Sequence, residues 1–246
     1  MRIYAHRGSS GTHPENTLAA FLDAAKLPIH GIEFDVHMTK DGELVIIHDE
    51  KIDRTSNGKG YVKDKTLAEL RNYDFGSWFS PTFKGERIPT LEEVLDIYSD
   101  TSHQINIELK SDVINYPGMT EKVLDVVSNL NLDHRIVISS FNLDAIRTVE
   151  ELAPHIETGA LFLKPLKNPL ETVLTIPADA LHIRFKTALK PAMQPVYTAK
   201  IPVRVYTVNT IKYVKDLSEI GVEAIFTDFP EEMYAYITHK LNKSSS

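Results

Sequence analysis

Two acids and a histidine share one face of the segment from Gly31 to Asp49. Glu33, Asp35 and His37 alternate there with apolar residues, and this period of two is typical of a β-strand. Two carboxylates two positions apart on a strand repel each other unless a cation lies between them. A solvated strand face is the ordinary explanation, and the segment alone leaves both explanations open.

The same segment reads as a hairpin that returns a histidine to the acids. Lys40-Asp41-Gly42 is a turn signal, and an apolar strand follows it and ends at His48-Asp49. A turn centred between residues 40 and 41 would place Glu33 opposite His48, although a one-residue bulge would shift this pairing. The hairpin would then bring both carboxylates and an imidazole together.

A third acid, Glu108, ends another apolar strand, and the three carboxylates suggest a metal site. Hard oxygen ligands, in a chain without cysteine or a His-x-x-x-His spacing, suit Mg²⁺ or Ca²⁺ rather than zinc. Such an ion would remove the repulsion between Glu33 and Asp35. The competing explanation is an ion pair of Glu108 with Lys110 on one strand face.

Two histidines and two cations complete a set of residues suited to a phosphodiester. His6 and His48 could act as general acid and general base, because imidazole titrates near neutral pH. Arg7 and Lys110 could hold the phosphate. Arg7 follows His6 directly, so the turn at Gly8 must redirect one of the two side chains. A lone histidine at a strand end is more often structural.

Eight strand–helix units alternate along the chain and favour a (β/α)8 TIM-type barrel. Several strands are apolar on both faces, as expected for a parallel sheet covered by helices. An open doubly wound sheet is the alternative, but no Gly-x-Gly-x-x-Gly follows the first strand. In a barrel, active groups gather at the carboxyl ends of strands. His6, Glu33, Asp35 and Glu108 stand at such ends.

An aperiodic stretch at residues 50–88 interrupts this alternation after the hairpin. It is rich in turn residues and aromatic residues, and we interpret it as a small inserted cap with a short helix at Leu67–Arg71. The next helix, Leu91–Tyr98, begins with a Thr90-x-x-Glu93 capping box. Asn16 or Thr17 is expected to cap the first helix.

Composition limits the classes of partner and the location. The chain has 246 residues and a net charge of −7, so a single barrel domain over 1–246 is expected and nucleic acid is an improbable partner. The absence of cysteine excludes disulfides and thiolate catalysis. We expect no signal peptide and no stable membrane insertion, and we predict a cytoplasmic location. The oligomeric state is left open.

Ordered motifs along nearly the whole chain resemble the glycerophosphodiester phosphodiesterase family. They are His6-Arg7-Gly8, Pro14-Glu15-Asn16-Thr17, Glu33-Phe34-Asp35-Val36, Thr39-Lys40-Asp41-Gly42, His48-Asp49 and Glu108-Leu109-Lys110. Further segments that resemble the family are Asp53-Arg54-Thr55, Asn57-Gly58-Lys59-Gly60, Gly85-Glu86-Arg87-Ile88-Pro89-Thr90 and Thr227-Asp228-Phe229-Pro230.

The resemblance implies a barrel enzyme that hydrolyses glycerophosphodiesters to glycerol 3-phosphate and an alcohol. The implied roles are acid–base catalysis for His6 and His48, binding of a divalent cation for the three acids, phosphate binding for Arg7 and Lys110, and orientation of Arg7 for Glu15. The resemblance leaves open the alcohol, the metal, and whether water or the glycerol hydroxyl attacks first. A phospholipase-type barrel acting on lysophospholipid or phosphoinositide, and a non-catalytic barrel that binds a metal or phosphate ester, are the alternatives.

One position departs from the family pattern. Tyr206 stands where relatives often carry tryptophan before Thr-Val-Asn, so the expected aromatic wall beside the substrate is smaller here. Phe141 could add another apolar face, and both side chains could equally pack at the barrel rim. His182 is expected inside the barrel. Trp78 and Phe79 are expected to anchor the cap.

Overall fold

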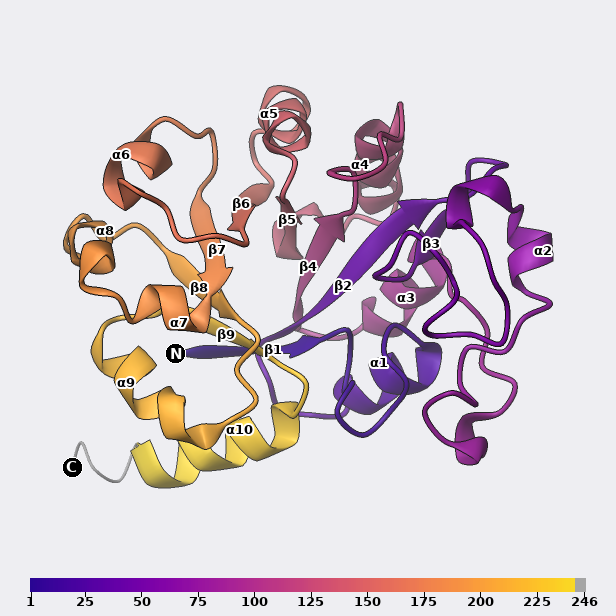
Figure 1. The fold of residues 1–246 in the computed structure, drawn as a ribbon, viewed down its shortest axis with the longest axis horizontal. Coiled ribbons are helices and arrows are strands. Elements are labelled where there is room, and N and C mark those ends of the chain that lie inside the picture. Colours follow the sequence, from indigo (N-terminus) through magenta and orange to yellow (C-terminus); the bar gives the residue numbers. More distant parts are fainter. Residues whose placement is uncertain (242–246) are drawn as a thin grey trace.

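Eight parallel strands close into a barrel within residues 1–241, the part of the chain that this computed structural model describes. The strand order is β1-β9-β8-β7-β6-β5-β4-β2, and pairing of β1 with β2 closes the ring. A further strand, β3, pairs antiparallel with β2 outside the ring. Helices surround the strands in Figure 1. The predicted barrel is confirmed, and residues 242–246 of the predicted domain lie outside the described residues.

The elements follow the predicted alternation closely. The strands are β1 Arg2–His6, β2 Gly31–Met38, β3 Leu44–Ile46, β4 Gln104–Leu109, β5 Ile136–Ser140, β6 Glu157–Phe162, β7 Ala180–Arg184, β8 Val203–Tyr206 and β9 Ala224–Thr227. The α-helices are α1 Leu18–Ala24, α2 Leu67–Leu70, α3 Leu91–Tyr98, α4 Met119–Asn129, α5 Leu143–Leu152, α6 Pro169–Leu174, α7 Phe185–Ala188, α8 Gln194–Thr198, α9 Val214–Glu219 and α10 Pro230–Tyr236. Within residues 1–241, no helix combines the length and hydrophobicity needed to cross a bilayer.

Helix starts were easier to predict than the elements after β7. Thr17 caps α1, and Thr90 forms the predicted capping box with Glu93 at the start of α3. The helical segment after α7 is divided, because Pro191 starts a separate 3-10 turn and Pro195 lies in the first turn of α8. The sequence pattern gave no signal for α7, which directly follows β7.

β2 has one apolar face and one polar face, as its alternation predicted. Phe34 packs its ring edge-on against Phe21 of α1, with ring centroids 5.6 Å apart, in the core between strands and helices. Glu33 and Asp35 belong to the opposite face. Both lie in the middle of β2, not at its end as predicted, because β2 continues past the barrel to pair with β3. The long strand therefore serves both the barrel and the hairpin.

The hairpin register differs by one residue from the prediction. Val36 pairs with Ile46, a ladder that does not place Glu33 opposite His48. The loop has three residues rather than two, because the Thr39 amide donates to the Glu43 carbonyl across it. The third loop residue, Gly42, has a φ of 84°. Such a left-handed residue forms the bulge that completes a three-residue hairpin loop.

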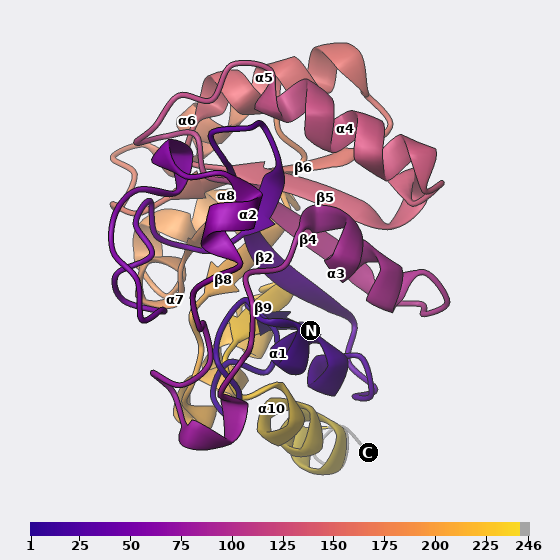
Figure 2. The ribbon, with the colours of Figure 1, turned by 90° about the vertical axis from the view of Figure 1, so that its right-hand side faces the viewer.

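The insertion at residues 50–88 packs on the hairpin and has its own small core. Figure 2 shows its helix α2 on the same side of the barrel as α7, the side where the strands end. The indole Nε1 of Trp78 donates to the Phe75 carbonyl at 2.9 Å, but Trp78 is 40% exposed and is not part of this core, so its anchoring role stays a prediction. The buried residues of this core are Val45, Ile47, Ile52, Val62, Leu70, Phe75 and Ile88.

A buried arginine crosses the barrel interior at the opposite end. Arg204 of β8 is 1% exposed and pairs with two carboxylates, Glu157 of β6 and Glu223 before β9. Its Nε lies 2.7 Å from the Glu223 carboxylate. A buried arginine without partners would be costly, and these pairs link β8 to β6 and to the start of β9.

We expect Arg204→Ala to lower the free energy of unfolding by about 3–5 kcal/mol, because it leaves two carboxylates without their partner. Urea unfolding at neutral pH would measure the change. Lys215→Ala is the matched control, since Lys215 lies 3.6 Å from Glu219 in an exposed pair and its loss should cost under about 1 kcal/mol. Equal losses in the two variants would contradict a structural role for the buried pair.

Candidate active site

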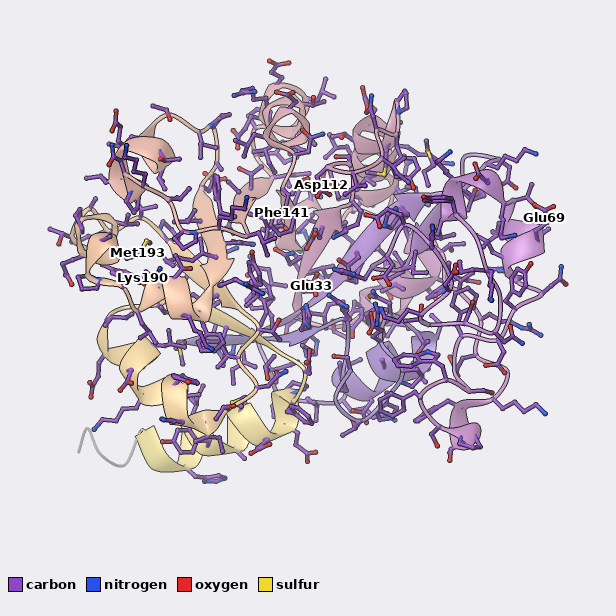
Figure 3. All side chains as sticks on the ribbon, viewed as in Figure 1. Glu33, Glu69, Asp112, Phe141, Lys190 and Met193 are labelled. Atoms are coloured by element: carbon purple, nitrogen blue, oxygen red, sulfur yellow. The ribbon has the colours of Figure 1, made fainter. Side chains whose placement is uncertain are left out.

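A cavity of about 1070 Å³ opens at the carboxyl ends of the strands. Most of the side chains predicted for the site line it: His6, Arg7, Glu33, His48, Glu108, Lys110, Phe141 and Tyr206. Asp35 lies beneath this surface and is 1% exposed, and Glu15 stands beside Arg7. Figure 3 shows Glu33 near the centre of the ring, with Phe141 and Asp112 close by. No residue of the insertion lines the cavity.

Three buried carboxylates meet at the bottom of this cavity. Glu33 and Asp35 come from β2 and Glu108 from β4, where Asp35 and Glu108 are directly paired across the strands. One carboxylate oxygen from each residue can be chosen so that all three oxygens lie within 4.8 Å of one another. All three residues are at most 9% exposed. The distance suits three ligands around one cation.

The three acids do not share the same electrostatic surroundings. Burial raises the pKa of Glu33 well above its usual value, and the charges of Asp35 and Glu108 raise it further. Burial also raises the pKa of Glu108, although Lys110 opposes this shift. Burial acts the same way on Asp35, but there Arg7, His48 and Lys110 outweigh it and lower the pKa.

Cations and an amide partly balance the carboxylates. Arg7 Nε lies 3.4 Å from Asp35, and the Asn16 amide donates to the same carboxylate at 2.9 Å. Lys110 Nζ lies 2.9 Å from Glu108 and 4.0 Å from Asp35. The strand ion pair considered from the sequence is therefore present, and it coexists with the acidic cluster.

Arg7 reaches this cluster through an unusual backbone conformation. Its own φ is 58°, so the change of direction begins at Arg7 and continues through Gly8, whose φ is 77°. The Arg7 amide donates to the Glu33 backbone carbonyl at 2.9 Å and to its carboxylate at 3.1 Å. The guanidinium Nη1 donates to Glu15 at 2.7 Å. Arg7 and His6 can therefore both serve the cavity.

Each of the two predicted catalytic histidines is held by a carboxylate. His6 Nδ1 lies 2.6 Å from Asp228, leaving Nε2 toward Glu33 at 3.9 Å. His48 Nδ1 lies 2.7 Å from Asp49. A carboxylate at Nδ1 fixes the tautomer and orientation of an imidazole and leaves Nε2 for proton transfer. His48 lines the cavity despite the altered register, because it lies beyond the end of β3.

Arg54 of the insertion joins the partners of these residues. Its guanidinium donates to both Glu15 oxygens, at 2.7 and 2.8 Å, and to both Asp49 oxygens, at 2.8 and 3.0 Å. Glu15 holds Arg7 and Asp49 holds His48. Arg54 thus connects the carboxylate that holds Arg7 with the carboxylate that holds His48.

The two predicted aromatic residues form one wall. Phe141 and Tyr206 meet edge to face, with centroids 6.4 Å apart. The Tyr206 hydroxyl donates to the Phe162 backbone carbonyl at 2.8 Å, so it is already committed. Lys110 Nζ lies 5.7 Å from the centre of the Phe141 ring. The wall is therefore apolar on the side that faces the cavity.

The sequence analysis missed the residues that orient the histidines and Asp35. Asp49 directly follows His48, and Asp228 lies in a segment that resembled the family but had no assigned chemistry. Asn16 was considered only as a helix cap, yet its side chain holds Asp35. Arg54 lies in an aperiodic loop. His182 is buried inside the barrel as expected, and burial, helped by Arg204, lowers its pKa well below the usual value.

The comparisons with known proteins agree with this geometry. The model of the glycerophosphoryl diester phosphodiesterase family matches residues 6–232. This chain belongs to that family. It is 41% identical over 231 residues to a glycerophosphodiester phosphodiesterase of Caldanaerobacter subterraneus subsp. tengcongensis, covering 94% of this chain and 95% of the relative. It is 40% identical over 233 residues to one of Bacillus altitudinis, again covering 94% and 95%.

Solved structures of related proteins have the same fold. A phosphodiesterase of Oleispira antarctica, in complex with the product sn-glycerol-3-phosphate, superposes with a TM-score of 0.86 at 30% identity, covering 97% of both chains. A glycerophosphodiester phosphodiesterase of Agrobacterium tumefaciens superposes with a TM-score of 0.80 at 28% identity, covering 95% of this chain and 99% of that one. The predicted family and enzyme class are confirmed.

The raised pKa of Glu33 predicts a stability gain on its neutralisation. In metal-free protein, we expect Glu33→Gln to raise the free energy of unfolding at pH 7 by about 0.5–2 kcal/mol, because it removes a buried charge. The folded state binds the Glu33 proton more tightly than the unfolded state does. The resulting contribution to the wild-type free energy of unfolding is fully present below the unfolded pKa, about 4.3, and is lost as pH rises through the folded pKa. The gain should therefore disappear toward pH 4.

Thermal unfolding in chelator across pH 4–8 would measure this difference. Glu219→Gln is the control, because Glu219 is 65% exposed and should give no gain that grows with pH. A Glu33→Gln protein that is less stable than wild type at pH 7 would show that the charge is already compensated.

Proposed function

We propose that this chain hydrolyses glycerophosphodiesters to glycerol 3-phosphate and an alcohol through metal-dependent acid–base catalysis. The observation that carries the proposal is the meeting of two carboxylate-held imidazoles with three buried acids in one cavity. The named relatives and the product complex of the Oleispira antarctica enzyme support the substrate class. The proposed partner is thus a small phosphodiester, not a nucleic acid.

Glu33, Asp35 and Glu108 would hold the divalent cation, Mg²⁺ or Ca²⁺. The donor set fits, because it consists only of hard carboxylate oxygens. Burial and the charges of Asp35 and Glu108 raise the pKa of Glu33 more than Arg7 lowers it, an imbalance that a cation would relieve. A bound cation supplies positive charge that polarises a phosphoryl oxygen and offsets the charge that develops during displacement.

His6 and His48 would exchange the two protons that the reaction requires. One Nε2 accepts the proton of the attacking hydroxyl, and the other donates a proton to the departing alkoxide. Asp228 and Asp49 hold the opposite nitrogens and stabilise the protonated rings. The same pair serves attack by water or by the glycerol 2-hydroxyl, the latter giving a cyclic phosphate as intermediate.

Arg7 and Lys110, which line the cavity beside the three acids, would bind the phosphate. Their present partners, Asp35 and Glu108, are the acids that a bound cation would neutralise, so both side chains could then turn toward the anion. Glu15 keeps the Arg7 guanidinium in place. Phe141 and Tyr206 would flank one arm of the substrate.

The alternative functions lack a specific observation in their favour. Aromatic residues of the insertion would favour a lysophospholipid substrate if they lined the cavity, and none of them does. Phosphoinositide hydrolysis and non-catalytic binding would be separated by product analysis. A single functional domain and a cytoplasmic location stay predictions.

Release of glycerol 3-phosphate in a coupled assay, with chelator as control, tests the reaction. We expect Glu33→Gln and Asp35→Asn to abolish turnover, and His6→Ala and His48→Ala to reduce kcat by about 100-fold to 10,000-fold, the usual contribution of acid–base catalysis. His155→Ala should leave kcat unchanged, because His155 is 63% exposed and only contacts Asp133. The proposal would be contradicted if turnover persisted in chelator and also persisted in the His6→Ala and His48→Ala variants.

The same assay distinguishes the remaining routes and substrates. A trapped cyclic phosphate, or failure of an analogue without the 2-hydroxyl, would indicate attack by the substrate's own hydroxyl. Faster release from lysophosphatidylcholine than from glycerophosphocholine would favour the phospholipase alternative. Binding without any product would indicate a non-catalytic barrel, and added Mg²⁺ or Ca²⁺ should raise the unfolding temperature in either case.

Arg54 is expected to act as a positioning residue. Arg54→Ala should lower kcat about tenfold, raise KM and shift the pH profile of kcat/KM, because Asp49 and Glu15 both lose their shared partner. Arg54→Lys should restore only part of the wild-type kcat and KM, since lysine cannot donate to both carboxylates as a planar guanidinium does.

Arg71→Ala is the matched control for Arg54, because Arg71 is a half-exposed arginine of the same insertion and pairs with Glu93. It should leave the pH profile unchanged. If both variants lose stability without any shift of the profile, Arg54 is merely structural.

A further inference from the structure

The cavity extends well beyond the acidic cluster, toward β7 and α7. Arg184 ends β7, Lys186 lies in α7, and Lys190 follows α7, and all three line the cavity. Figure 3 shows Lys190 to the left of Glu33, beside α7. Beyond the acids at the bottom, the only carboxylate that lines the cavity among the described residues is Asp112. This half of the cavity, defined by Arg184, Lys186 and Lys190, is the cationic half.

These three cations have no carboxylate partner. Among residues 1–241, no acidic oxygen lies within 4.0 Å of the charged nitrogens of any of them, and none of the three side chains donates a hydrogen bond. The Lys186 ammonium lies 5.9 Å from the centre of the Phe185 ring. In a chain with a net charge of −7, unpaired cations gathered on one side of a cavity produce a field that attracts anions.

We propose that the cationic half receives the alcohol arm of the phosphodiester and selects alcohols that carry a negative charge, such as a further phosphodiester group. This inference rests on the proposed function. The phosphate belongs beside Arg7 and Lys110, and the glycerol arm is uncharged. The alcohol arm is therefore the part of the substrate whose charge can complement Arg184, Lys186 and Lys190.

The charge of the arm decides between substrate classes. A cationic arm such as choline is repelled by three cations, and an uncharged arm gains nothing from them. An anionic arm gains binding affinity from each cation that it contacts. Each such exposed ion pair changes the affinity by no more than about fivefold. Leu161, Leu163 and Pro165 line the same region and can contact the carbon skeleton of any of these alcohols.

Three diesters that differ in the charge of the alcohol arm test the proposal. They are glycerophosphocholine with a cationic arm, glycerophosphoglycerol with a neutral arm, and bis(glycerophospho)glycerol with an anionic arm. At low ionic strength we expect kcat/KM to rise in that order, by about tenfold or more from the first to the last. The preference should shrink in high salt, because screening weakens exposed charges.

Charge reversal locates the effect. Lys186→Glu and Lys190→Glu should each lower the ratio of kcat/KM for the anionic over the cationic diester by about threefold to tenfold. Lys26→Glu changes the net charge equally, but Lys26 is an exposed residue after α1 that does not line the cavity. Its ratio should match the wild-type ratio.

The outcomes separate this inference from the proposed function. Hydrolysis of all three diesters at equal kcat/KM, or a ratio that Lys186→Glu and Lys190→Glu leave unchanged, overturns the anionic preference while the phosphodiesterase activity stands. A ratio that Lys26→Glu changes as strongly assigns the effect to net charge and also overturns the subsite. Failure to release glycerol 3-phosphate from any diester overturns the proposed function itself.

Discussion

The burial of three like charges at one point is the constraint on which the rest of the site depends. Glu33, Asp35 and Glu108 are drawn together by strand pairing, and taking carboxylates out of water is costly unless cations or donors compensate them. Arg7 and Lys110 provide two positive charges for three acids. This incomplete compensation is the feature on which the proposed cation site rests.

β2, which carries two of these acids, is longer than its barrel neighbours because it also pairs with β3. Its first part pairs with β1 and β4 and carries Glu33, which lines the cavity, and Asp35, which lies beneath it, whereas its last residues pair with β3 outside the ring. The return strand delivers His48 locally, and His37 of β2 contacts the His48 carbonyl with Nε2 at 3.2 Å. β2 and its return strand thereby position two of the clustered acids, one imidazole and the surface on which the insertion packs.

Sequence reasoning predicted the parts of the site that follow from strand ends and missed those that follow from loop geometry. His6 and Glu108 converge because parallel strands of a barrel end at one mouth, a rule that needs no coordinates. The register of the hairpin was wrong because Gly42 adds a bulge that the turn signal alone does not reveal. Asp228 reaches His6 only because β9 closes the barrel beside β1, and Arg54 lies in a loop without periodicity.

The charge distribution around the mouth separates the two tasks of the site. The three acids and His6 belong to β2, β4 and β1, whose positions the sheet pairing fixes, and these residues carry the proposed chemistry. The unpaired cations belong to the end of β7 and to the short α7, where side chains are exposed. Substitutions at the second side can change the alcohol that is accepted without disturbing the buried charges. The proposed chemistry and the proposed selectivity therefore rest on different elements, the first buried in the sheet and the second exposed and open to change.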